Sequence, residues 1–385
     1  MEEPQQSNWR NLIAACAAIS VFGLTFGMTY PLLSLILESR GVSEGMIGVN
    51  AAMSPMGILL FSPVLPIAVK KFGAKPLAIM AALLAALIIP GYKFFPSLGA
   101  WFVLRFLHGM IVTTLFILSE SWIVKYSAVK HRGRIVAVYA SVLSASFATG
   151  PALIGWLGIE GWTPFIIATG VLLVGTLPLF LVVDKPGKFS HKPGTTNFFA
   201  IAPKAPMLLA SVATFAIFDA ATLSLLTVYA IRSGLDLTTA AQTLTALIAG
   251  NIFLQYPIGW LADRVEKRVV LALCAIFTLV TLLMLPNVMG SVWMWPTLVI
   301  AGSTGYGMYT VALAALGDRF EGEELIAGMA AFSVMWGIGA LTGTTIAGWA
   351  MSGFGPQGFP YVLAAIYALY LIGLATRLRV AEAAR

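Results

Sequence analysis

The decapeptide GWLADRVEKR, residues 259–268, stands between two apolar runs that are each long enough to cross a lipid bilayer. A membrane-spanning helix needs about 20 mostly apolar residues, and apolar residues make up 59% of this 385-residue chain, against 10% that are charged. With a mean hydropathy of +0.90, this composition excludes a soluble globular protein. The sequence therefore predicts an all-α integral membrane protein with twelve spans, centred near residues 25, 58, 84, 113, 146, 172, 219, 250, 279, 305, 338 and 369.

The basic residues predict the orientation of these spans. If both termini are cytoplasmic, 19 of the 23 lysines and arginines fall on the cytoplasmic side, the outer loops carry only Arg40, Lys93 and Arg232, and Arg105 lies within a span. This distribution follows the positive-inside rule. We therefore expect a multi-pass inner-membrane protein with cytoplasmic termini. Its net charge of +7 then reflects topology and attraction to anionic lipid rather than binding to nucleic acid.

An internal repeat divides the chain into halves. GPALIGWL at 150–157 returns as GTTIAGWA at 343–350, an offset of 193 residues, and the same offset places Gly109 on Gly302. Two six-helix halves are expected, with the Pro- and Gly-containing segment between them as a cytoplasmic linker. The predicted boundaries are 1–183 for the first half, 184–206 for the linker and 207–385 for the second half.

In this repeated arrangement of spans, the decapeptide resembles the loop signature Gly-x-Leu-Ala-Asp-Arg-x-Gly-Arg-Lys of the major facilitator superfamily. Glu266 stands where glycine is usual. RFLHG at 105–109 resembles that family's helix-4 motif. GPALIG at 150–155 resembles its helix-5 motif, typical of proton-coupled antiporters, although Ile154 replaces one glycine. With SESWIVKY (119–126) and RGRIVAVYASVLS (132–144), the chain is most similar to bacterial YcaD-like members. The resemblance implies two pseudo-symmetric six-helix bundles that rock around a central site.

The first-half copy of the signature, PIAVKKFGAK at 66–75, carries Lys70 and Lys71 where the signature has acid and arginine. The resemblance implies that this loop meets the acidic start of helix 11 when the cytoplasmic side is shut, while the second-half loop meets the basic start of helix 5. The expected inner gate comprises Lys70, Lys71, Arg132, Arg134, Asp263, Arg264, Glu323 and Glu324. Alternatively, the two glutamates merely favour a helix N-terminus and the lysines follow the positive-inside rule.

Three charged residues lie within predicted spans: Arg105, Glu120 and Asp219. Inserting a charge at the bilayer centre costs on the order of 2.5–3.5 kcal/mol, so such residues are functional candidates. Asp219 has no acidic counterpart at an offset of 193 and is the first candidate for a proton site, with Glu120 the second. Glu120 is equally well interpreted as a structural partner of the basic start of helix 5. Arg105 would bind an anionic substrate or act on a nearby acid.

Aromatic and amide side chains at mid-span positions are candidates for a substrate pocket. Most tryptophans fall near span ends, as the interfacial belt requires, whereas Trp336 does not. Ordinary helix packing is the competing interpretation of the others. The substrate-binding candidates are Arg105, Phe26, Tyr30, Asn251, Gln255, Tyr306, Tyr309 and Trp336.

The chain contains no Gly-x-x-x-x-Gly-Lys-Ser/Thr loop for nucleotide, and no metal or other cofactor is expected. We therefore predict a monomeric secondary transporter, a proton-coupled antiporter that exports a small amphipathic compound. A proton-coupled importer of a small anionic metabolite is the alternative. A membrane-embedded enzyme would need a nucleophile with a base, or a set of metal ligands, in one layer of the membrane, and the sequence shows neither. A non-transporting receptor or scaffold is the remaining alternative, but such a protein would not need buried acids.

Overall fold

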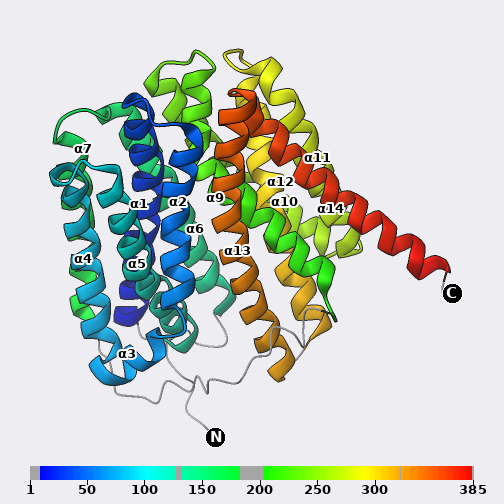
Figure 1. Cartoon of the computed structure of the whole chain (residues 1–385). Helices are drawn as coiled ribbons and strands as arrows, with labels where there is room; N and C mark the ends of the chain where they lie inside the picture. The colour runs from blue at the N-terminus through cyan, green and yellow to red at the C-terminus, as the bar shows by residue number, and fades with distance from the viewer. Residues whose placement is uncertain (1–8, 127–131, 183–202, 321, 384–385) are drawn as a thin grey trace, which may run out of the picture. The chain divides into compact units, whose positions relative to one another are not determined.

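A computed structural model of the chain describes residues 9–126, 132–182, 203–320 and 322–383 (Figure 1). A few side chains inside helices, including those of Arg132, Arg134 and Glu323, lie outside the described part. Within these ranges the backbone forms thirteen α-helices and one 3-10 helix, η2. The helices are α1(Trp9–Ser39), α2(Glu44–Phe61), α3(Leu65–Phe72), α4(Ala74–Phe94), α5(Leu98–Tyr126), α6(Arg132–Leu157), α7(Thr163–Thr176), η2(Leu177–Leu181), α9(Pro206–Arg232), α10(Leu237–Ala262), α11(Lys267–Val288), α12(Met294–Arg319), α13(Gly322–Phe354) and α14(Gly358–Ala383).

Twelve helical segments in the described part are long and apolar enough to cross a membrane. Each of the twelve predicted span centres falls inside one of them, so the predicted all-α fold is confirmed. The agreement follows from bilayer thickness, because about 20 apolar residues in helical form match the hydrocarbon core.

The segment predicted as the loop 66–75 is instead largely helical. Leu65–Phe72 forms the short helix α3, with a proline in its first turn, and Gly73 at φ 83° separates it from α4. Leu65 and Val69 are buried one turn apart, whereas Lys70 and Lys71 are exposed. This amphipathic pattern stabilises a helix that lies along a surface. The signature motif alone predicted a loop here and did not indicate this helix.

Contacts divide the chain into two compact units. The first comprises Met1–Leu33 and Met53–Lys192, and the second comprises Ser34–Ala52 and Pro193–Arg385. In the first unit, α4 packs on α5 and α7. In the second, α9 packs on α13, and α11 packs between α12 and α14 (Figure 1). Most of the predicted linker 184–206 lies outside the described residues.

Equivalent close contacts occur in both units at glycines. A Cβ at Gly109 would lie 2.0 Å from the carbonyl oxygen of Ser54, and a Cβ at Gly302 would lie 1.9 Å from that of Leu247. Both residues of the second pair follow those of the first by 193 positions. Small residues allow helix backbones to approach closely in membranes, where packing rather than hydrophobicity drives association. The sequence repeat is thus a repeat of helix contacts, α2 on α5 and α10 on α12.

Candidate functional site around Asp219

Asp219 lies in the middle of α9, where small residues let α13 approach. A Cβ at Gly339 would lie 2.7 Å from the carbonyl oxygen of Ala213, and one at Gly343 would lie 2.6 Å from the Cα of Ile217. Close contact at these glycines brings α13 along the face of α9 and places Trp336, about one turn before Gly339, beside Asp219.

A third glycine brings α12 to the same place. A Cβ at Gly305 would lie 2.5 Å from the ring of Phe218, so this ring packs directly on the α12 backbone. Tyr306 follows Gly305 in the sequence, and its ring centroid lies 6.1 Å from that of Phe218. Tyr306 therefore reaches the residue that follows Phe218 on α9, which is Asp219.

The donor side chains of Tyr306 and Trp336 are neighbours of the Asp219 carboxylate. Asp219 is only 9% exposed. A buried carboxylate is strongly disfavoured unless hydrogen-bond donors or charges compensate for the lost water. The two donors stabilise the ionised form, while the surrounding apolar side chains favour the neutral form.

Aromatic rings surround this carboxylate. Phe215, one turn before Asp219 on α9, lies with its ring centroid 5.0 Å from that of Tyr309 and 5.7 Å from that of Tyr306. The structure thus gathers Asp219, Tyr306, Tyr309 and Trp336, which were separate candidates in the sequence. Phe215 was missed, although its i to i+4 spacing from Asp219 puts both on one helix face.

The first unit contains a second cluster, around Arg105. The rings of Phe22, Phe26 and Tyr30 follow one another along α1, with centroids 4.9 and 5.1 Å apart. The Arg105 guanidinium lies 5.0 Å from the Tyr30 ring centroid, a cation–π geometry. Arg105 is 1% exposed. The candidates Phe26, Tyr30 and Arg105 therefore form one continuous set.

Next to Arg105, the Tyr92 hydroxyl lies 3.4 Å from His108 Nδ1, and the Trp101 indole N–H donates to the Tyr92 carbonyl at 2.9 Å. The Ser54 hydroxyl donates to the Arg105 carbonyl at 3.2 Å. These bonds fix the segment of α5 that carries Arg105 against α2 and α4.

Glu120 lies further along α5 and is exposed at the surface of the first unit. Ser119, the residue before Glu120, shares a hydrogen bond of 2.8 Å with the Tyr139 hydroxyl of α6. The side chains of Arg132 and Arg134, its suggested structural partners, lie outside the described residues.

Asn251 and Gln255 of α10 are hydrogen-bonded to each other, the Gln255 amide donating to the Asn251 side-chain oxygen. Among the described residues, the Gln255 side-chain oxygen is buried without a hydrogen-bond partner. The amide pair thus retains one acceptor without a hydrogen-bond partner among the described residues.

The signature decapeptide forms mainly local contacts. The Arg264 guanidinium lies 3.8 Å from the Trp260 ring centroid, Asp263 is exposed at the end of α10, and Lys267 pairs with Asp318 at the end of α12. Glu324 pairs with Lys204 at 2.5 Å, within the second unit. The remaining gate candidates Lys70 and Lys71 are exposed on α3.

Twelve spanning helices, a repeated set of helix contacts and a carboxylate buried at mid-span define a polytopic transporter fold. The sequence profile described as Major Facilitator Superfamily matches residues 15–316 and 234–385, and the chain belongs to this family. It is 28% identical over 349 residues to the uncharacterized MFS-type transporter YfkF of Bacillus subtilis (strain 168), covering 87% of each chain. It is 22% identical over 367 residues to the uncharacterized MFS-type transporter YcaD of Escherichia coli (strain SMS-3-5 / SECEC), covering 95% of each.

Solved structures show the same fold. The nucleoside transporter NupG superposes with a TM-score of 0.80 at 12% identity, over 95% of this chain and 98% of that one. The D-xylose-proton symporter superposes with a TM-score of 0.73 at 14% identity, over 94% of this chain and 96% of that one. At these identities the likeness shows the fold and not the substrate.

Proposed function

We propose that this protein is a proton-coupled antiporter that exports a small amphipathic compound by alternating access. The observation that carries the proposal is the Asp219 carboxyl, buried at mid-span beside donor side chains from two other helices, Tyr306 of α12 and Trp336 of α13. An acid within a membrane span is energetically costly, so its presence there favours a functional role.

The chemistry of this site suits competition between a proton and a substrate. Protonation removes the charge that the donors Tyr306 and Trp336 can stabilise, because hydrogen bonds to an ionised group are roughly twice as strong as those to a neutral group. A bound amphipathic compound that carries a positive charge would instead favour the ionised carboxylate. The aromatic rings of Phe215, Tyr306 and Tyr309 offer stacking and cation–π contacts to such a compound.

Import of a small anionic metabolite with protons is the second proposal. Arg105 favours it, because a buried guanidinium beside Tyr30 is suited to bidentate recognition of a carboxylate or phosphate. In either case Glu120 is the second candidate for the coupled proton. The D-xylose-proton symporter is, as its name states, a protein of this fold that couples transport to protons.

The proposal includes the topology that the charges predict. The protein would act as a monomer in the inner membrane with both termini cytoplasmic, because the basic residues gather on that side. Its halves would be residues 1–183 and 207–385, joined by the linker 184–206.

The test is transport by Asp219→Asn in inverted and right-side-out membrane vesicles, with and without an imposed pH gradient. Ethidium serves as the amphipathic cation and benzoate as the small anion. We expect the wild type to concentrate ethidium only with a gradient. Asp219→Asn should reduce that accumulation by about tenfold, because the amide is isosteric but cannot ionise. Downhill exchange should be retained.

Glu120→Gln makes the same acid-to-amide change at the second proton candidate, in the first unit. If Asp219→Asn still concentrates a probe against its gradient with unchanged pH dependence, Asp219 is not the coupling residue and Glu120 is tested next. Accumulation of benzoate but not ethidium, lost in Arg105→Gln, would replace export of an amphipathic compound by import of an anion.

A further inference from the structure

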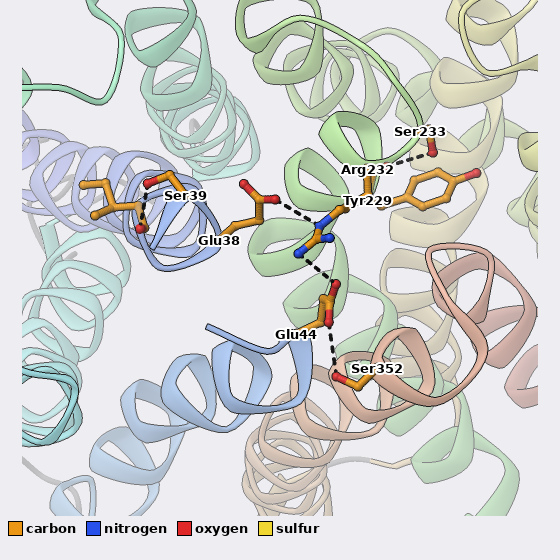
Figure 2. Close-up of polar contacts among 8 residues, drawn as sticks. Glu38, Ser39, Glu44, Tyr229, Arg232, Ser233 and Ser352 are labelled. Atoms are coloured by element: carbon orange, nitrogen blue, oxygen red, sulfur yellow. Dashed lines mark hydrogen bonds and ion pairs between the residues drawn. The ribbon is translucent and has the colours of Figure 1, made fainter. Parts of the chain in front are cut away.

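A charged cluster outside the Asp219 site connects helix ends that are far apart in the sequence. At the C-terminal end of α9, Arg232 Nε lies 3.0 Å from Glu38 Oε1, and its Nη2 lies 3.4 Å from Glu44 Oε1 (Figure 2). Glu38 is in the last turn of α1, and Glu44 begins α2. The Arg232 side chain is 40% exposed and each glutamate side chain 16%. One guanidinium therefore bridges both arms of the α1–α2 hairpin.

Ser352, near the end of α13, completes the cluster. Its hydroxyl donates to Glu44 Oε2 at 3.3 Å and accepts from the Gly45 backbone N–H at 2.8 Å (Figure 2). The two oxygens of Glu44 are thus used by two different helices, one by Arg232 of α9 and the other by Ser352 of α13.

Backbone packing beneath these polar contacts is equally close. A Cβ at Gly48 of α2 would lie 2.2 Å from the Thr344 carbonyl oxygen of α13, and one at Gly348 would lie 2.4 Å from the Glu44 carbonyl oxygen. Any side chain at either glycine would push the hairpin and α13 apart.

The partners come from different halves of the sequence. Glu38 and Glu44 precede the linker, whereas Arg232 and Ser352 follow it, and Ser34–Ala52 belongs by its contacts to the second unit. Arg232 lies thirteen residues from Asp219, about 20 Å along a helix. It is also at the end of α9 that adjoins the start of α10, and so opposite the signature decapeptide at the end of α10.

We infer that Glu38, Glu44, Arg232 and Ser352 form a reversible latch, which holds the tip of the α1–α2 hairpin, Ser34–Ala52, on α9 and α13 and opens during the transport cycle. The inference rests on the proposed function in one respect, that the protein works by alternating access. Partly exposed ion pairs are typically worth under about 1 kcal/mol each. Two such pairs with one shared arginine are therefore strong enough to bias a conformation and weak enough to be broken in each cycle.

The test is a distance measurement that needs no substrate. Nitroxide labels are attached to Ser43→Cys, before α2, and Phe354→Cys, at the end of α13, two exposed positions in a background with Cys16→Ala and Cys274→Ala. Double electron–electron resonance then reports the separation of the hairpin and α13 in lipid nanodiscs. We expect one dominant short distance in the wild type. In Arg232→Ala a second, longer distance should appear, and the ratio of the long-distance to the short-distance population should rise about fivefold.

Three further variants make the test specific. Gly48→Ala should produce the same long distance by steric displacement, without changing charge. Arg232→Lys should give an intermediate population, because an ammonium lacks the fork that reaches two carboxylates. Lys93→Ala, which removes a basic residue outside the cluster, should leave the distribution unchanged.

A single distance, unchanged from the wild type, in both Arg232→Ala and Gly48→Ala would overturn the latch. If these variants also unfold at a lower temperature, the cluster is purely structural. The measurement uses no pH gradient. Failure of proton-coupled transport in the vesicle assay would therefore leave this result standing.

Discussion

At the scale of single residues, the described structure shows how polar side chains are accommodated in an apolar helix bundle. Asp219 has hydrogen-bond donors on two neighbouring helices, whereas Arg105 lies against the face of Tyr30. Asp236, outside the spans, has the simplest arrangement. It caps α10 by accepting from the Thr239 backbone N–H at 3.1 Å and from the Thr239 hydroxyl at 2.6 Å.

These bonds predict a pH dependence for the start of α10. Hydrogen bonds from the Thr239 side chain, and then from its backbone, lower the pKa of Asp236 below its usual value. A carboxyl whose pKa is lower in the folded state stabilises the fold above its unfolded pKa, about 3.9, and loses that effect as the pH falls through its folded pKa. We expect Asp236→Ala to lower the unfolding temperature in detergent at pH 7, with a smaller difference from wild type below about pH 4.

Asp236→Asn is the control, because asparagine caps helices equally well and does not titrate. It should resemble the wild type at pH 7 and show less change on acidification. A wild-type-like unfolding temperature for Asp236→Ala at both pH values would show that this cap does not limit stability.

At the scale of elements, glycines determine how closely the helices pack. In each unit a glycine of one helix lies on a backbone carbonyl of another, as at Gly57 on Phe106 of α5 and Gly250 on Val299 of α12, where an added Cβ would lie 2.2 and 2.1 Å from the oxygen. These two contacts are again 193 residues apart. Lipid provides no hydrophobic force between helices, so this shape complementarity carries the packing energy.

We therefore expect Gly109→Ala and Gly302→Ala to destabilise the protein by about 1–3 kcal/mol each, since the added methyl meets backbone rather than a flexible side chain. Thermal unfolding of the purified protein in detergent measures this. Gly170→Ala is the matched control, a helical glycine of α7 with no heavy atom within 4 Å of an added Cβ. It should be neutral or slightly stabilising, because alanine is the better helix former. Equal stability of all three variants would contradict the packing argument.

At the scale of the whole molecule, several charged residues at the helix ends are exposed or form exposed ion pairs. Glu324 is paired with Lys204 in the described structure, while the lysines on α3, Lys70 and Lys71, are exposed. Exposed ion pairs are weak, so replacing one partner by another during transport requires little free energy. The proposed inner gate uses this property.

For the gate, we expect Lys70→Glu/Lys71→Glu to slow ethidium transport about fivefold, the effect of losing roughly 1 kcal/mol of pairing. Combining it with Glu323→Lys/Glu324→Lys should restore part of the rate in inverted vesicles. Lys204→Gln, which frees Glu324 from its present partner, should not reproduce the loss. A fourfold variant no faster than the slower double variant would exclude this pairing.

Several features of the protein follow from the sequence alone. The twelve spans were predictable because hydropathy over about 20 residues is a local property that bilayer thickness makes decisive. The repeat was predictable because Gly109 and Gly302 occupy equivalent positions. Asp219 stood out as a candidate because charge inside a span is rare and costly.

Only the tertiary structure brought Tyr306 and Trp336 to Asp219, and Arg232 to Glu38 and Glu44. Hydropathy determines that a segment is a membrane helix, but it does not determine which face of that helix meets which neighbour. That choice depends on where small residues allow two backbones to touch, as at Gly305 on Phe218, and on side chains that are far apart in the chain. Because lipid solvates every apolar face almost equally, helix rotation and partner choice are decided by interhelical packing and hydrogen bonds.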